Sequence, residues 1–144
     1  MFNVEWFDKV YIKKDGNCIF RAISVFVNKE LTNCRRKRTG ELFNNELSEK
    51  ENKLYSSLRL IVVTYMDMHK TKFINSLQFD DTIYDSIDKR IEGMSCDGEF
   101  GGELELYIIS KIFKMPINVF VKTSNGVNLI SKLGRDRTNV CNLY

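Results

Sequence analysis

Residues 15–22 read Asp-Gly-Asn-Cys-Ile-Phe-Arg-Ala, and they place a cysteine at the point where a turn meets a helix. The segment before Cys18 has the composition of a turn, Lys13-Lys14-Asp15-Gly16-Asn17. After Cys18, apolar residues follow at helical spacing: Ile19, Ala22, Ile23, Phe26 and Val27. The pattern predicts a helix that begins at or just after Cys18 and buries one of its faces.

This position favours chemistry at the thiol of Cys18. The first N–H groups of a helix have no partners within the helix, and with the positive end of the helix dipole they favour a thiolate. The same N–H groups can point at an oxyanion, as acyl transfer requires, and Gly16 can take positive φ angles and let a substrate carbonyl approach. The alternative is that Cys18 is a small buried hydrophobic residue, as most free cysteines are. Position alone favours neither interpretation.

The remaining chain is helical first and extended late. Residues 33–52 are polar and charged, which predicts a loop or a loosely packed helix. Three later helices are predicted: Leu54 to Leu77, a short one marked by Ile83, Ile87 and Ile91 and closed by Gly93, and Leu104 to Phe113 after an acidic loop at 95–103.

Pro116 ends the helical part of the chain. Three strands are predicted after it: Ile117 to Val121, Val127 to Ile130 beyond a hairpin turn at Ser124-Asn125-Gly126, and Asn139 to Tyr144. Helices followed by a small sheet predict an α+β or mixed α/β domain.

Length and charge exclude several classes of protein. A chain of 144 residues is long enough for one core and too short for two domains, so residues 1–144 are expected to form a single domain. The net charge of +3, with acids and bases mixed along the chain, is too small to argue for nucleic-acid binding. The N-terminus lacks the features of a signal peptide, and no apolar run is long enough to span a bilayer.

The four cysteines are widely spaced and form no Cys-x-x-Cys pair, and the chain has one histidine. Neither a zinc site nor a disulfide scaffold is expected. Cys34, Cys96 and Cys141 have no histidine or acid at useful spacing and are interpreted as structural. We therefore expect a reduced, intracellular protein, cytoplasmic or nuclear, that does not act on membranes.

Four segments, in order, resemble the ovarian tumour (OTU) family of cysteine proteases. The block Asp15–Arg21 is similar to the family's D-G-x-C-x-F-R nucleophile motif, and Leu58-Arg59 with Val62 and Tyr65 to its L-R-x-x-V-x-x-Y helix. Residues 100–106 resemble its W-G-G-x-x-E-L segment, with Phe100 where tryptophan is usual, and Ile117-Asn118-Val119 resembles the strand that follows. The likeness covers roughly residues 8–144.

The resemblance implies a papain-like OTU fold, with a small central β-sheet packed between helices, and a deubiquitinase. Cys18 would attack the carbonyl of the C-terminal glycine of ubiquitin, polyubiquitin or a ubiquitin-like modifier, and the N–H groups of Gly16, Asn17 and Cys18 would hold the oxyanion. Asp15, the other catalytic candidate, would shape this turn rather than act as the acid of the triad. The modifier's tail would be bound by Asp97, Glu99, Phe100, Gly101 and Gly102. The enzyme would be a monomer that needs neither metal nor cofactor.

The sequence departs from the family in its general base. OTU enzymes take it from a histidine just after a C-terminal strand, and Asn139–Tyr144 resembles that strand without a histidine following. We expect these residues to be a fragment of a longer chain; the alternative is an inactive ubiquitin-binding module. His69, on the long helix, matches no catalytic segment and is expected to be structural or on the surface. Nucleic-acid binding through the basic run 34–38 is the third and least supported interpretation.

Overall fold

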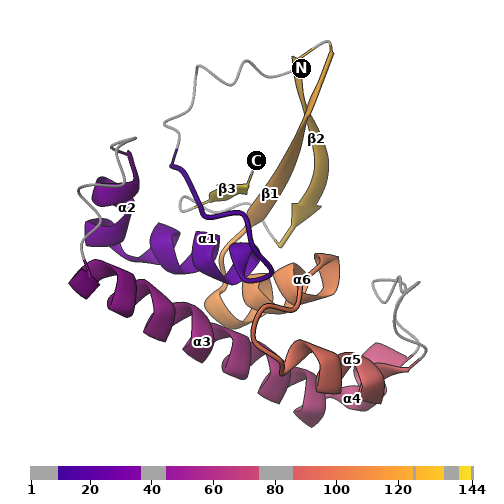
Figure 1. The fold of residues 1–144 in the computed structure, drawn as a ribbon. Coiled ribbons are helices and arrows are strands. Elements are labelled where there is room, and N and C mark those ends of the chain that lie inside the picture. Colours follow the sequence, from indigo (N-terminus) through magenta and orange to yellow (C-terminus); the bar gives the residue numbers. More distant parts are fainter. Residues whose placement is uncertain (1–9, 37–44, 75–85, 125, 135–139, 144) are drawn as a thin grey trace.

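The computed structural model describes residues 10–36, 45–74, 86–124, 126–134 and 140–143 (Figure 1). Its elements are α1 Cys18–Val27, α2 Lys29–Arg36, α3 Asn45–Met68, α4 Lys70–Ile74, α5 Ile87–Met94, α6 Glu103–Phe113, β1 Ile117–Thr123, β2 Gly126–Leu133 and β3 Cys141–Leu143. None of the helices within these residues is long and apolar enough to cross a membrane.

The longest helix starts earlier than its apolar pattern predicts. A loop or loosely packed helix was expected over 33–52, but α2 continues to Arg36 and α3 begins at Asn45; residues 37–44 lie outside the described part of the chain. The first turns of α3 are anchored by a buried leucine, Leu47, and by Glu51, whose side chain is fully buried. Polar composition was misleading here because Glu51 is buried against a cation, Arg21, from another helix.

The ends of three other predicted elements also shift. α3 stops at Met68 and the separate helix α4 follows, whereas one helix was expected to Leu77; residues 75–77 lie outside the described residues. Gly93 lies inside the last turn of α5 instead of closing it. α6 ends as predicted before Pro116, through a left-handed residue, Lys114, with φ of 51°. β1 and β2 are longer than predicted, and the turn residue Asn125 is not among the described residues.

The three strands form one small mixed sheet in the order β2-β1-β3. β1 and β2 form an antiparallel hairpin with an irregularity between Val119 and Phe120. β3 pairs with β1 in parallel, with Cys141 opposite Ile117, and the N–H of Cys141 donates to the carbonyl of Pro116 over 2.9 Å. The third strand predicted near the C-terminus is thus present at Cys141–Leu143.

The core lies where α1, α3 and α6 meet under the sheet. β3 contacts α1 and β2 contacts α6, while α3 packs against both of these helices on their other side (Figure 1). Fully buried side chains from all three helices and the sheet fill this space: Phe20, Ile23, Val62, Met66, Leu104, Ile108, Ile109 and Ile117. The buried face of α1 therefore fixes the helix whose first residue is Cys18.

Candidate active site

Cys18 is the first residue of α1 and is half-buried, as predicted for the start of this helix. Its N–H donates to the carbonyl of Asp15 over 3.1 Å, which closes the turn that leads into the helix. Asn17 is the N-terminal cap residue, and its own N–H donates to Oδ1 of Asp15 over 3.0 Å. The turn thus presents the thiol at a helix N-terminus, and the N–H groups of Asn17 and Cys18 both donate to Asp15.

Asp15 is held by a buried arginine one turn into α1. Nε of Arg21 donates to both carboxylate oxygens, at 3.2 and 3.1 Å, and Nη2 forms an ion pair with Oδ2 at 3.0 Å. Burial acts to raise the pKa of Asp15, but the hydrogen bonds from Arg21 and Asn17 lower it below its ordinary value. The carboxylate therefore stays ionised and shapes the turn, which is the role that the sequence predicted for it.

The same arginine ties α1 to α3. Nη1 of Arg21 forms an ion pair with the buried Glu51 at 3.0 Å, and the guanidinium lies 4.3 Å from the ring centre of Tyr55. Burial opposes ionisation, but the hydrogen bonds to Asp15 and Glu51 raise the pKa of Arg21. Because α1 runs from the level of Arg59 toward Glu51, the two helices are antiparallel.

The loop after α5 packs directly on the Asp15–Cys18 turn. The N–H of Gly98 donates to Oδ1 of Asn17 over 2.9 Å. A Cβ atom on Gly101 would lie 3.5 Å from Ile19 and 3.6 Å from Phe20, so this glycine lies against the first turn of α1. The structure thus brings the predicted nucleophile turn and the predicted tail-binding segment together.

Within that segment the side chains differ in exposure. Asp97 and Phe100 are exposed, Phe100 to 67%, and Glu99, Gly101 and Gly102 are half-buried. The Gly102 N–H donates to Oε1 of Glu105 over 2.7 Å. Glu105 is fully buried and forms a two-point ion pair with Arg90 on α5, at 2.7 and 3.0 Å. The buried ion pair therefore fixes the backbone of Gly102 at the start of α6.

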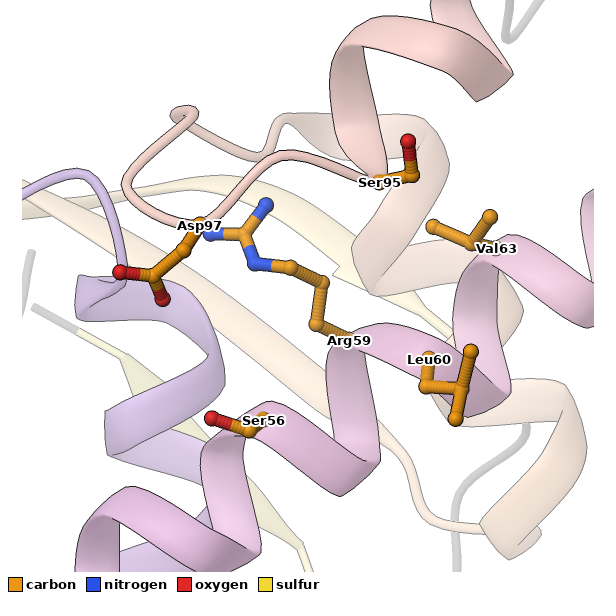
Figure 2. A pocket seen from close by; sticks show the side chains of 6 residues that line it. All are labelled: Ser56, Arg59, Leu60, Val63, Ser95 and Asp97. Atoms are coloured by element: carbon orange, nitrogen blue, oxygen red, sulfur yellow. The ribbon is translucent and has the colours of Figure 1, made fainter.

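Arg59, on α3, holds the other end of this loop and is 4% exposed. Burial lowers its pKa below the usual range, and the nearby carboxylates of Asp97 and Glu99 act in the opposite sense. A pocket of about 160 Å³ opens beside it, lined by Ser56, Arg59, Leu60, Val63, Ser95 and Asp97 (Figure 2). Figure 2 shows Arg59 extending from α3 toward Asp97. Cys18 does not line this pocket.

No role was predicted from the sequence for Arg21, Arg59, Arg90 or Glu51, and the burial of Glu105 was not foreseen. The sequence feature that could have identified such residues is a charged residue among apolar ones on a helix: Arg59 follows Leu58, and Glu105 stands between Leu104 and Leu106. A charge in such a position must be paired when the helix packs.

The lone histidine lies away from this turn. His69 follows the last residue of α3, and its ring centre lies 4.4 Å from that of Tyr65. It is ten residues beyond Arg59, or about 15 Å along the helix axis, in the direction opposite to the course of α1. The expected non-catalytic role of His69 agrees with this placement.

The three remaining cysteines differ in environment. Cys141 is buried in the core, which raises the pKa of its thiol to about 12. Cys34 packs against the small cluster formed by Val25, Leu31 and Leu47. Cys96 is exposed, and its Sγ donates to the carbonyl of Glu92 over 3.6 Å. In the described part of the chain, no group of three or more His, Cys, Asp or Glu side chains could hold a metal. The basic run 34–38 extends outside the described residues.

Comparison with known proteins agrees with this geometry. A family model described as OTU-like cysteine protease matches residues 13–143. Among solved structures, the OTU domain of OTUD1 is 20% identical with a TM-score of 0.60, covering 92% of this chain and 73% of that chain. No curated protein matches the sequence.

Two viral OTU domain proteases have the same fold. The protease from Dera Ghazi Khan virus is 17% identical with a TM-score of 0.66, covering 98% of this chain and 76% of that chain. The protease from Qalyub virus is 16% identical with a TM-score of 0.60, covering 98% and 79%. At these identities the structures show the fold, and they confirm the predicted α+β OTU fold.

Proposed function

Because the chain belongs to the family of OTU-like cysteine proteases, we propose that it hydrolyses isopeptide bonds at the C-terminus of ubiquitin or a ubiquitin-like modifier. Cys18 is the proposed nucleophile. The observation that carries the proposal is the place of this thiol: it is half-buried at the first residue of α1, on a turn held by Arg21 and Arg59. A thiol used only for packing has no need of a turn fixed in this way.

In the proposed reaction the thiolate of Cys18 bonds to the carbonyl carbon of the modifier's last glycine. The lysine amine leaves with a proton, and water then releases the modifier from the thioester. The N–H groups of Gly16, Asn17 and Cys18 are the proposed oxyanion donors. Since those of Asn17 and Cys18 donate to Asp15 in this structure, binding an oxyanion requires these hydrogen bonds to be shared or redirected.

The segment 97–102 is the proposed binding site for the modifier's tail. Gly101 and Gly102 carry no side chain that would obstruct the Gly-Gly end, and Gly101 lies against the first turn of α1. Exposed Phe100 offers an apolar contact, and the carboxylates of Asp97 and Glu99 suit the arginines in ubiquitin's tail.

We place the general base on a histidine that follows β3 in the complete protein. Two observations support this placement: β3 contacts α1, the helix of Cys18, and His69 lies about 15 Å along α3 in the other direction. The proposed enzyme is an intracellular monomer that uses no metal or cofactor and acts on neither nucleic acid nor membranes.

The test is reaction with ubiquitin that carries a C-terminal electrophile, followed by peptide mapping. Label on Cys18 and on none of Cys34, Cys96 and Cys141 is expected, and Cys18→Ala should abolish it. Cys96→Ala is the matched control, because Cys96 is exposed and lies on the neighbouring loop. Label on Cys96 or Cys34 with Cys18 unmodified would refute the assignment.

A non-catalytic ubiquitin-binding module is the second candidate. The specific observation in its favour is that the chain's single histidine lies far from Cys18. Such a module would bind ubiquitin but leave Cys18 unreacted with the electrophile, even when a longer natural chain is used. Reaction of Cys18 in either form of the chain excludes it.

A further inference from the structure

Arg59 is the one side chain that contacts both the turn carrying Cys18 and the loop after α5 through its guanidinium, within the described residues. Nη2 donates to the carbonyl of Gly16 at 3.2 Å, to Oδ1 of Asn17 at 2.7 Å and to the carbonyl of Glu99 at 2.9 Å. Nη1 donates to the carbonyl of Met94 at 3.1 Å. The planar fork thus joins two segments that are about eighty residues apart in the chain, and each of them is about forty residues from Arg59.

The two segments also contact each other directly around this arginine. Oδ1 of Asn17 accepts from both Nη2 of Arg59 and the N–H of Gly98. The ring of Phe20, two residues after Cys18, lies beneath the guanidinium, with 4.4 Å between Cζ and the ring centre. A shift of the loop after α5 would therefore pull on Arg59 and Asn17, and through them on Cys18.

Burying the charged side chain of Arg59 at this position costs desolvation free energy. Its exposed fraction is only 4%, and its acceptors among the described residues are four carbonyl and amide oxygens and the thioether sulfur of Met94 rather than a paired carboxylate. Asp97 and Glu99 favour its charge from farther away. Apolar residues would pack here without the desolvation cost, but they could not make the hydrogen bonds by which the guanidinium joins the two segments.

We propose that Arg59 is a positioning residue that sets the place of Cys18 relative to the loop 94–99. This inference rests on the proposed function, in which residues 97–102, which overlap and continue that loop, bind the modifier's tail and Cys18 attacks its end. Arg59 touches neither reacting atom: it fixes the distance between the site where the tail binds and the thiol. An electrophile held by the tail depends on that distance, whereas a small free electrophile does not.

The first test needs no ubiquitin. In Arg59→Lys the ammonium keeps the charge but cannot bond all four oxygens, so amide hydrogen exchange should quicken about tenfold or more in residues 15–20 and 95–99 together. Exchange in α6 should stay unchanged. The matched control is Arg90→Lys, another buried arginine on the neighbouring helix, which should affect residues 101–105 and spare 15–20. Unchanged exchange in 15–20 for Arg59→Lys, or an equal rise in α6, would overturn the proposal.

The second test separates positioning from binding and stability. With the ubiquitin electrophile, Arg59→Lys should lower the limiting rate of Cys18 labelling about tenfold or more while the half-saturating concentration changes little. Alkylation of Cys18 by iodoacetamide should change less than about twofold, because that reaction needs only an accessible thiol. A purely structural role would lower the melting temperature and change both reactions together.

Two further outcomes remain decisive. If Cys18 fails to react with the ubiquitin electrophile both in this chain and in a longer chain that carries the proposed histidine after β3, the proposed function is wrong, while the exchange experiment still decides the role of Arg59. If Arg59→Lys does not fold, Gly98→Ala tests the same coupling from the loop, since Gly98 has φ of 83° and open space for a methyl group. Faster exchange in residues 15–20 of that variant supports the coupling, and unchanged exchange refutes it.

Discussion

A Cβ atom built on Gly16 would lie 1.4 Å from the carbonyl oxygen of Gly98. The backbone of the turn before Cys18 and the backbone of the loop after α5 therefore pack with no space for any side chain between them. From the sequence, Gly16 was expected to take positive φ and to let a substrate carbonyl approach. The structure shows positive φ at Gly98 and Gly134 among the described glycines, so the need at Gly16 is for close approach of another backbone.

Gly16→Ala should consequently separate the two segments. We expect a loss of about 1–3 kcal/mol in the free energy of unfolding, because the obstructing atoms belong to backbone and cannot rotate away. Denaturant unfolding measures this loss, and labelling by the ubiquitin electrophile should fall with it. Gly101→Ala is the control: its nearest neighbours lie at 3.5–3.6 Å, so stability should change by less than about 1 kcal/mol. Equal stability losses in the two variants would contradict this account.

The local pattern was sufficient to predict α1, α6 and the strands. Apolar spacing from Ile19 to Val27, the stop before Pro116 and the alternation of Ile117 to Val121 each depend on near neighbours, which a sequence displays directly. The family block also located Cys18 at a helix start, as the structure has it.

Long-range pairing of charges could not be predicted in this way. Glu51 stands in a polar stretch typical of a surface, and its burial becomes evident only when Arg21, thirty residues earlier, is placed beside it. Arg59 likewise gains its partners from segments about forty residues before and after it. Because nothing in a single sequence specifies which buried charge meets which, the early start of α3 and the contact between turn and loop came only from the structure.

Acid should lower the free energy of unfolding by protonating Asp15 in the turn before Cys18. The folded-state pKa of Asp15 is lowered below 3.8, so its ionised form adds stability that is fully present above about pH 5 and is lost as the pH falls through the lowered value. The difference in unfolding free energy between the unaltered chain and Asp15→Asn should therefore shrink between pH 5 and pH 2. Glu49→Gln, at an exposed position on α3, serves as the control and should show a flatter difference. A difference that grows with acid would contradict the sign.

Cys141 should resist modification in the folded protein. Its thiol is 1% exposed, and burial raises its pKa to about 12, so at pH 8 it is both covered and protonated. We expect iodoacetamide to label Cys141 more slowly than either the exposed Cys96 or the half-buried Cys18, as measured by mass spectrometry of peptides. All four cysteines should label at similar rates in denaturant, which is the control. Native labelling of Cys141 as fast as Cys96 would place it outside the core.

The loop carboxylates should contribute electrostatically to modifier binding. Asp97→Ser with Glu99→Ser should weaken binding of ubiquitin about three- to tenfold at low salt, and less at high salt, since rim charges are screened. Affinity is measured by titration at two ionic strengths. Glu46→Ser with Glu49→Ser removes the same charge from exposed positions in the first turns of α3 and should leave affinity unchanged. Equal effects of the two pairs would indicate a response to net charge alone.

His69→Ala should leave the reactivity of Cys18 essentially unchanged. The imidazole lies against Tyr65 at the end of α3, and α1 runs the other way along that helix from Arg59 toward Glu51, so no small movement brings His69 to the thiol. The measurement is the rate of Cys18 labelling by the ubiquitin electrophile and, in a longer natural chain, the cleavage of di-ubiquitin. Loss of a catalytic histidine after β3 should lower the rate of di-ubiquitin cleavage by orders of magnitude, because loss of one triad member removes most of the chemistry. Its replacement by alanine in that longer chain is therefore the positive control for His69→Ala. If His69→Ala instead abolished reaction while the melting temperature held, the base would lie on α3 and the placement of the histidine after β3 would be wrong.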